Sequence, residues 1–304
     1  MRWLWLTVFL ILMGGVFTWA RLADVKANRD WKTVERLMGH SGRSEGDGFK
    51  IKVPRSDLNV LVHGSWVDPR AGLNSWFSFK PLARGCLLTG ELVLVDWEAP
   101  RAESLLASYQ LTLTSIFRPF NGENPGIECV DFTGKGPRIL LAQEARTLLA
   151  ATSMPMTPPP PAANPPTAAQ TAFNLSLEKL LGPATWEGET LNFSFVSSEP
   201  VMREGIEIPS YMGLETMFHF QPDGKQTKVY GQWVISPAET QDVLESLMKN
   251  NIGITNIHSG PLNQSPQMVY VDFWTEGEPI KIAKFLKEAV KTTRLTGQIL
   301  ESPK

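Results

Sequence analysis

Apolar and polar positions follow two different periods along the chain, and the same order of periods occurs twice. Alternating runs rich in β-branched and aromatic residues are typical of strands, and in the second half they lie at 216–221, 227–235, 253–257 and 268–274. Between them, Val243, Leu244 and Leu247 recur at helical spacing after Ser236. A second helix is expected from about 279 to 292. The pattern therefore predicts strand, strand, helix, strand, strand, helix.

The first half of the chain repeats this order at a constant offset of 141 residues, as from Leu73 to Leu214. The register holds without a gap from Leu73 to Gly136, where Gly90 matches Gly231 and Asp131–Phe132 matches Asp272–Phe273. A constant register of this length indicates duplication rather than chance.

The predicted fold class is therefore α+β, with two tandem ββαββα repeats that resemble permuted ferredoxin-like sandwiches. We expect a first repeat at 28–151, which includes a short helix near 28–39, and a second repeat at 172–304. The two sheets would pack on each other or pair edge to edge, and the sequence leaves both arrangements open.

The segment 1–20 is a hydrophobic targeting signal. Arg2 precedes an uncharged apolar run from Trp3 to Ala20, which needs lipid or an export machinery. Small residues before position 21 fit signal-peptide cleavage, and the run is also long enough to be an uncleaved anchor. We expect a periplasmic or secreted protein that touches the membrane only through residues 3–20.

The segment 152–171 differs in composition from both repeats. It contains seven prolines and no charged residue, and proline removes backbone donors and is excluded from helix interiors. We interpret it as a proline-rich linker between the repeats.

Charge and cysteine content exclude some functions. A formal net charge of −2 and a pI near 6.1 give no electrostatic basis for binding nucleic acid. Cys86 and Cys129 are too few for a disulfide framework, and the sequence leaves open whether they pair.

Candidate chemistry lies where a helix begins and the following strand ends, because a βαβ crossover brings these points to one sheet edge. This places Glu239 near the loop 257–260, which contains His258, and Glu98 near 116–119. A glutamate with imidazoles can bind a divalent metal, but a catalytic zinc usually has three protein ligands. Glu239 also fits the capping box that Ser236 opens.

Other polar residues have a structural interpretation. His219 lies within an apolar strand, which favours a core or sheet-face histidine. Asp131 and Asp272 recur within strands at matching positions, and a carboxylate there needs a hydrogen-bonding partner. The sequence contains no nucleophile elbow, His-Glu-x-x-His or phosphate-binding glycine loop.

The chain resembles the LppY/LpqO family, a bacterial envelope domain of unknown function (domain of unknown function 1259). The resemblance covers roughly 30–150 and 200–295 and is carried by Pro54–Leu58, Ser75–Phe79, Gly90–Leu94 and Met268–Trp274. Members carry His-Asn-His in each repeated loop. This chain has His258–Ser259–Gly260 in one loop and Phe117–Arg118–Pro119 in the other, so the resemblance implies that most of any metal-binding capacity has been lost.

These observations favour an uncharacterised envelope protein that binds a ligand or acts as a scaffold without catalysis. The ligand-binding candidates are His258, Glu239, Ser259 and Glu98, of which His258 and Glu239 are the metal candidates. A small molecule or an envelope protein would be the partner. The alternative is a metal-dependent, hydrolase-like enzyme that uses the edge formed by His258 and Glu239.

Overall fold

The computed structural model describes residues 31–70, 72–109, 111–156 and 167–297. The predicted targeting segment at 1–20 lies outside these ranges. Within them, no helix combines the length and the apolar character that crossing a bilayer requires.

The first repeat forms a six-stranded antiparallel sheet in the order β1-β2-β5-β6-β9-β7. Its strands are β1 (Arg43–Glu45), β2 (Gly48–Pro54), β5 (Asn74–Pro81), β6 (Cys86–Val95), β7 (Leu111–Phe117) and β9 (Ile127–Gly136). Its helices are α2 (Trp31–Met38), α3 (Ala99–Ser108) and α4 (Arg138–Ala150). The short strands β3 (Leu61–Val62), β4 (Ser65–Trp66) and β8 (Glu123–Asn124) form a separate small sheet.

The second repeat forms a corresponding sheet in the order β10-β11-β14-β15-β18-β16, with β19 added beside β11. Its strands are β10 (Ala184–Glu187), β11 (Thr190–Ser197), β14 (Glu215–Asp223), β15 (Gln226–Ile235), β16 (Gly253–Ser259), β18 (Val269–Gly277) and β19 (Leu295–Gly297). Its helices are α5 (Ala168–Leu181), α6 (Pro237–Lys249) and α7 (Pro279–Lys291), with the short helix η1 (Ser210–Met212). The strands β12 (Val201–Arg203), β13 (Ile206–Ile208) and β17 (Gln264–Ser265) form another small sheet.

The connection from β6 through α3 to β7 explains the strand order. The strand β9 lies between β6 and β7 and pairs antiparallel with both, so β6 and β7 run parallel and are joined by a helical crossover. The second repeat has the same arrangement with β15, α6, β16 and β18. This split βαβ unit occurs in ferredoxin-like folds. The α+β prediction with two repeats is confirmed.

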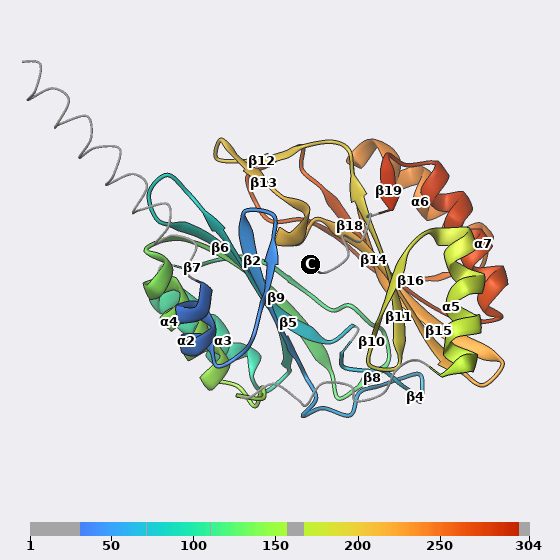
Figure 1. Cartoon of the computed structure of the whole chain (residues 1–304), viewed down its shortest axis with the longest axis horizontal. Helices are drawn as coiled ribbons and strands as arrows, with labels where there is room; N and C mark the ends of the chain where they lie inside the picture. The colour runs from blue at the N-terminus through green and yellow to red at the C-terminus, as the bar shows by residue number, and fades with distance from the viewer. Residues whose placement is uncertain (1–30, 71, 110, 157–166, 298–304) are drawn as a thin grey trace, which may run out of the picture.

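The molecule has four layers, with helices outside and the two sheets facing each other in the middle (Figure 1). Each sheet buries an apolar core against its own helices. Two further apolar clusters lie between the sheets and contain residues of both repeats. For example, Val93 and Trp274 share one cluster, and Leu87 and Val234 share the other. The two sheets therefore pack face to face.

The proline-rich linker at 152–171 falls partly outside the described residues, because 157–166 are not among them. The helix α5 begins within that range, where the Thr167 side chain and Gln170 form a capping box. Positions 168–171 of the predicted linker are thus the first turn of the second repeat's first helix, and the tether itself stays a prediction.

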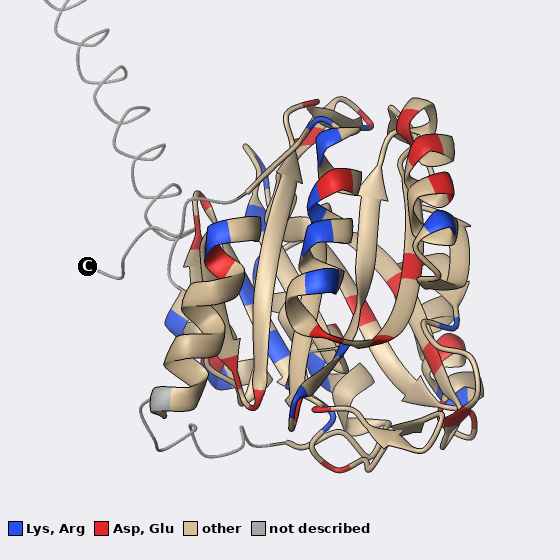
Figure 2. Cartoon of the chain, turned by 90° about the vertical axis from the view of Figure 1, so that its right-hand side faces the viewer, with Lys and Arg blue, Asp and Glu red and all other residues tan. Residues whose placement is uncertain are grey.

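The helices of the second repeat present basic and acidic residues together to solvent (Figure 2). The exposed Lys291 ammonium of α7, for example, pairs with Glu288 at 2.7 Å. Mixed charge of this kind is typical of a solvated helix face.

Candidate functional site

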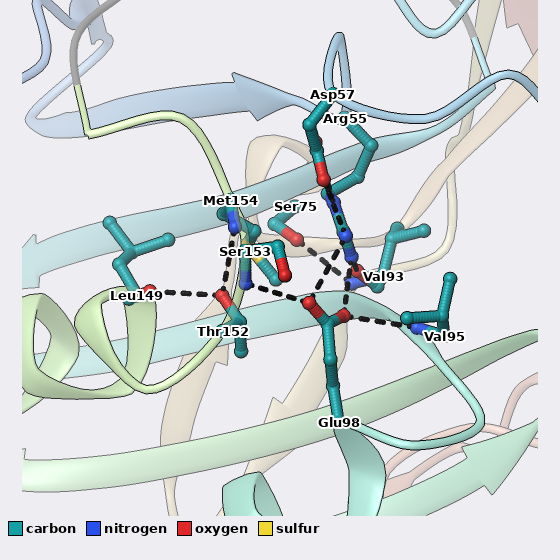
Figure 3. A network of polar contacts seen from close by, with 10 residues as sticks. All are labelled: Arg55, Asp57, Ser75, Val93, Val95, Glu98, Leu149, Thr152, Ser153 and Met154. Atoms are coloured by element: carbon teal, nitrogen blue, oxygen red, sulfur yellow. Dashed lines mark hydrogen bonds and ion pairs between the residues drawn. The ribbon is translucent and has the colours of Figure 1, made fainter.

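Glu98 lies at the start of α3 and is bonded on all sides. Its carboxylate accepts hydrogen bonds from the backbone N–H groups of Val95 (3.1 Å) and Ser153 (2.7 Å). It also pairs with the fully buried Arg55 guanidinium at 2.9 Å, and Arg55 contacts Asp57 in turn (Figure 3). Burial alone would raise the pKa of Glu98, but these bonds lower it on balance. The side chain is a buried junction between β6, α3 and the end of α4.

Glu239 occupies the equivalent position at the start of α6. It accepts hydrogen bonds from the backbone N–H of Ser236 (2.9 Å), from the Ser236 hydroxyl (2.7 Å) and from the backbone N–H of Arg294 (2.5 Å). The predicted capping box is present. In both repeats, therefore, the glutamate holds the same two backbone positions, three residues before it and 55 residues after it.

His258 lies on β16 and faces the space between the sheets. Its ring stacks on the Phe117 ring, its counterpart in the repeat, with centroids 4.0 Å apart, and also on Tyr270 at 5.1 Å. Its Nδ1 is 2.9 Å from the Asn256 amide nitrogen. Burial lowers the pKa of His258 to about 4, so the ring is neutral at physiological pH.

The structure does not bring the predicted site residues together. Within the described residues, no hydrogen bond or ion pair joins Glu239 or Glu98 to His258, and no three His, Cys, Asp or Glu side chains form a group that could hold a metal ion. His258 is instead 4.0 Å from the Asp272 carboxylate. Ser259 pairs with Val269 at the end of β16 and is exposed.

A cavity of about 170 Å³ lies between the two sheets and is lined by both repeats. Its polar lining includes Lys50, Lys52, Glu91, Asp131, Glu215, His219, Gln232 and Asp272. Its apolar and aromatic lining includes Trp76, Phe117, Phe120, Tyr230 and Tyr270. A concave space with an apolar lining and a few convergent polar groups is the usual form of a small-molecule site.

The polar groups lie in one row across each sheet, because neighbouring strands place opposed residues side by side on one face. In the first sheet, the row runs Trp76, Glu91, Asp131, Ser115. In the second sheet, the equivalent row runs Met217, Gln232, Asp272, Asn256. The aspartate is the member that both rows keep.

Burial perturbs the three acids in these rows. It raises the pKa of Asp131 to about 7, with a further contribution from the negative charge of Asp272. It raises the pKa of Asp272 to about 7 as well, although Gln232 and Asn256 donate to that carboxylate at 2.9 and 3.1 Å. Burial and both aspartates also raise the pKa of Glu91. Glu91 keeps partial exposure because it lines the cavity.

Two ion pairs join the repeats near the cavity, and each involves a lysine that lines it. The Lys50 ammonium is 3.2 Å from Glu215, and Lys52 is 2.7 Å from Glu187. Lys52 is exposed, so the cavity reaches solvent near this residue. His219 lines the same cavity and contacts the Asn192 amide oxygen at 2.8 Å, and burial lowers its pKa to about 3.

Both cysteines are free and buried. Burial raises the pKa of Cys86 to about 12 and also raises the pKa of Cys129, which lines the cavity. Because the thiolate is the reactive form, neither cysteine has the character of a nucleophile at neutral pH.

Sequence reasoning assigned Asp131 and Asp272 a structural role and did not single out Glu91. A signal was available: polar residues at matching positions inside two otherwise apolar strands, Glu91 with Gln232 and Asp131 with Asp272. Such a pattern places the polar groups on the equivalent face of each sheet, but it does not show that these two faces pack against each other.

No curated protein matches the chain. A solved structure of a trimeric bacterial microcompartment shell protein, PduB, is 12% identical and covers 84% of this chain and 91% of its own, with a TM-score of 0.20. A score that low carries no structural argument.

The family comparison is informative, because it covers both repeats. The model described as Domain of Unknown Function (DUF1259) matches residues 32–151 and again residues 176–292. These two segments coincide with the two α+β units of the fold. The chain therefore belongs to the DUF1259 family.

Proposed function

We propose that this protein is an exported, non-catalytic binding protein of the bacterial cell envelope, which takes up a small molecule in the cavity between its two sheets. The observation that carries the proposal is the cavity itself, which both repeats line with aromatic side chains and buried hydrogen-bonding groups. Duplication supports it, since a site between two related surfaces exists only when both copies are present.

The residues around the cavity favour binding over catalysis. Its histidine, His219, is neutral and fixed by Asn192, and its cysteine is a buried thiol. The hydrolase-like alternative requires Glu239, whose carboxylate already accepts bonds from Ser236 and Arg294. Freeing it would leave buried donors without partners.

We further propose that the chain is a member of the LppY/LpqO type in which both His-Asn-His loops are degraded. The stacked Phe117 and His258 occupy equivalent positions in the two loops. A phenylalanine at one of them replaces a potential metal ligand with an apolar ring, which favours a site for an organic molecule over one for a metal.

A thermal-shift screen tests binding. The folded protein would be screened against small amines, sugars, amino acids and organic acids, because a ligand that binds only the folded state raises the Tm. The matched variant is Met217→Trp, which places in the second row the residue that Trp76 provides in the first. We expect hits that this variant loses. Hits that persist unchanged in Met217→Trp, or no hit at all, would contradict the cavity as the binding site.

Export is tested separately with a reporter. Residues 1–30 fused to alkaline phosphatase, which is active only after export, should give activity in a bacterial host. Replacing Leu10 with arginine interrupts the apolar run and should abolish that activity. Equal activity from both fusions would contradict export through this segment.

A further inference from the structure

The cavity carries an excess of acidic groups that the chain's own cations offset only in part. Lys50 and Lys52, its lining lysines, pair with Glu215 and Glu187. The hydrogen bonds that reach the Asp272 carboxylate come from neutral amides.

One arginine also offsets these acids only in part. Arg203 lies close enough to lower the pKa of Asp131. Its guanidinium nevertheless donates to the hydroxyls of Thr89 and Thr133, both at 2.9 Å, rather than to a carboxylate. One further cation could therefore offset the negative charge of the acid row, which consists of Glu91, Asp131 and Asp272.

Glu91 and Asp131 lie opposite each other on the paired strands β6 and β9, and each carboxyl group affects the pKa of the other. Two buried carboxylates this close do not ionise together readily, so one of them holds a proton. The proton keeps two like charges from facing each other in a buried space. A bound cation would take over this role, because it offsets the same charge from the cavity side.

The walls of the cavity are suited to an organic cation. Aromatic faces attract ammonium groups, and Trp76 already has the Lys50 ammonium 4.9 Å from its ring centroid. Tyr230, Phe117 and Phe120 add further aromatic surface. A bare divalent ion would instead need several converging carboxylates, and the described residues contain no such group.

The size of the cavity limits the ligand. The cavity has a volume of about 170 Å³. Sites for drug-sized ligands are about 300–1,000 Å³. The ligand is therefore a single small group rather than a peptide or an oligosaccharide.

We infer that the cavity binds a small organic ammonium ion, with Glu91, Asp131 and Asp272 supplying the counter-charge and Trp76 and Tyr230 supplying aromatic walls. This inference rests on the proposed binding function and names its ligand class. Asp131 and Asp272, whose pKa values are about 7, must ionise to bind the cation, so binding releases protons near neutral pH.

Several charged or titratable groups face the acid row, and each belongs to an element that packs against it. They are Lys50 on β2, Arg203 on β12, Cys129 on β9, His258 on β16 and Tyr270 on β18. Burial keeps Cys129, Tyr270 and His258 uncharged near neutral pH. The change of charge between about pH 6 and pH 8 therefore comes from the acids, whose pKa values burial raises.

Isothermal titration with choline tests the ligand class in the full-length folded protein. Choline keeps its charge at every pH, so its affinity reports the protein's ionisation alone. Its control is the uncharged isostere in which a tert-butyl group replaces the trimethylammonium. We expect choline to bind at about pH 8, at least tenfold more weakly at about pH 6, and at least tenfold more tightly than the isostere.

The variant Glu91→Gln removes one charge and installs the residue that the equivalent row already has as Gln232. We expect it to fold and to weaken choline binding about tenfold, the effect of one unscreened charge in a buried site. Glu276→Gln, an exposed acid further along the strand of Asp272, should leave binding unchanged.

The outcomes separate this inference from the proposed function. Equal affinity for choline and its isostere, or affinity unchanged in Glu91→Gln, would overturn the cationic ligand. Thermal-shift hits that are confined to sugars or acids and are lost in Met217→Trp would also overturn the cationic ligand. They would leave the proposed binding function standing. Tight calcium or manganese binding that Glu91→Gln abolishes would also overturn it, in favour of a metal site.

Discussion

At the scale of single residues, the two equivalent glutamates should differ in how much they contribute to stability. Glu98→Gln leaves the buried Arg55 guanidinium with Asp57 as its remaining charged partner, so we expect a loss of about 3–5 kcal/mol. Glu239→Gln removes charge from a carboxylate held by neutral donors and should cost about 1–3 kcal/mol. Urea unfolding measures both, with Glu276→Gln as the exposed control. A larger loss for Glu239→Gln would contradict this order.

Asp272 should make the stability of the protein depend on pH. Its pKa is about 7 in the folded state and about 3.9 in an unfolded chain. A raised pKa means that the folded state holds the proton more tightly, so the stabilisation is complete below about pH 4 and is lost as the pH rises from about 4 to about 7. Asp272→Asn, which resembles the protonated acid, should therefore lose less stability than the wild type between about pH 4 and pH 7.

The Tm of both proteins across this range checks the prediction. His219 and His258 titrate in the unfolded chain over part of the same range, but they do so equally in both proteins, so the difference between the two curves isolates the acids. Parallel curves would show that Asp272 does not titrate there.

Residue-level prediction from sequence succeeded where the partner is local. The capping role of Glu239 could be predicted because Ser236 lies three residues away. The environment of Asp131 could not be predicted, because Asp272, which raises the pKa of Asp131, belongs to the other repeat. The prediction placed Glu239 and His258 together at one edge of the sheet. His258 instead faces the other sheet and stacks on Phe117.

At the scale of elements, the capping box of α6 gives a further prediction. Ser236→Ala removes the hydroxyl that bonds to the Glu239 carboxylate and should cost about 1 kcal/mol of stability. Ser246→Ala, within the same helix, should be neutral or slightly stabilising because alanine is the better helix former. Thermal or urea unfolding distinguishes the two, and equal effects would contradict a specific role for the cap.

Most elements could be predicted from periodicity, but the packing of the two sheets could not. The strand β6 gave a usable signal, because every residue from Cys86 to Val95 except Glu91 is buried. A strand that is buried on both faces must be covered on both. The helices of one repeat cover one face. The other face therefore required a second layer, but nothing local identified that layer as the second sheet.

At the scale of the whole molecule, the two repeats should unfold as one unit, although each has a complete core of its own. The reason lies between the sheets, where Val93 of the first repeat shares an apolar cluster with Tyr230 and Trp274 of the second. Separating the repeats would expose this cluster and the second apolar cluster between the sheets. Such exposure is costly in water at about 25 cal/mol per Å² of apolar surface.

Two matched truncations test this cooperativity. Leu73→Ala affects the cluster between the sheets, and Leu88→Ala affects the core beneath the first repeat's helices. Each should cost about 2–5 kcal/mol. In a single cooperative unit, both variants lower the hydrogen-exchange protection of the slowest amides in both repeats by the same amount. If Leu88→Ala lowered protection in the first repeat alone, the repeats would be separate folding units, and the cavity between them would depend on their docking rather than on one fold.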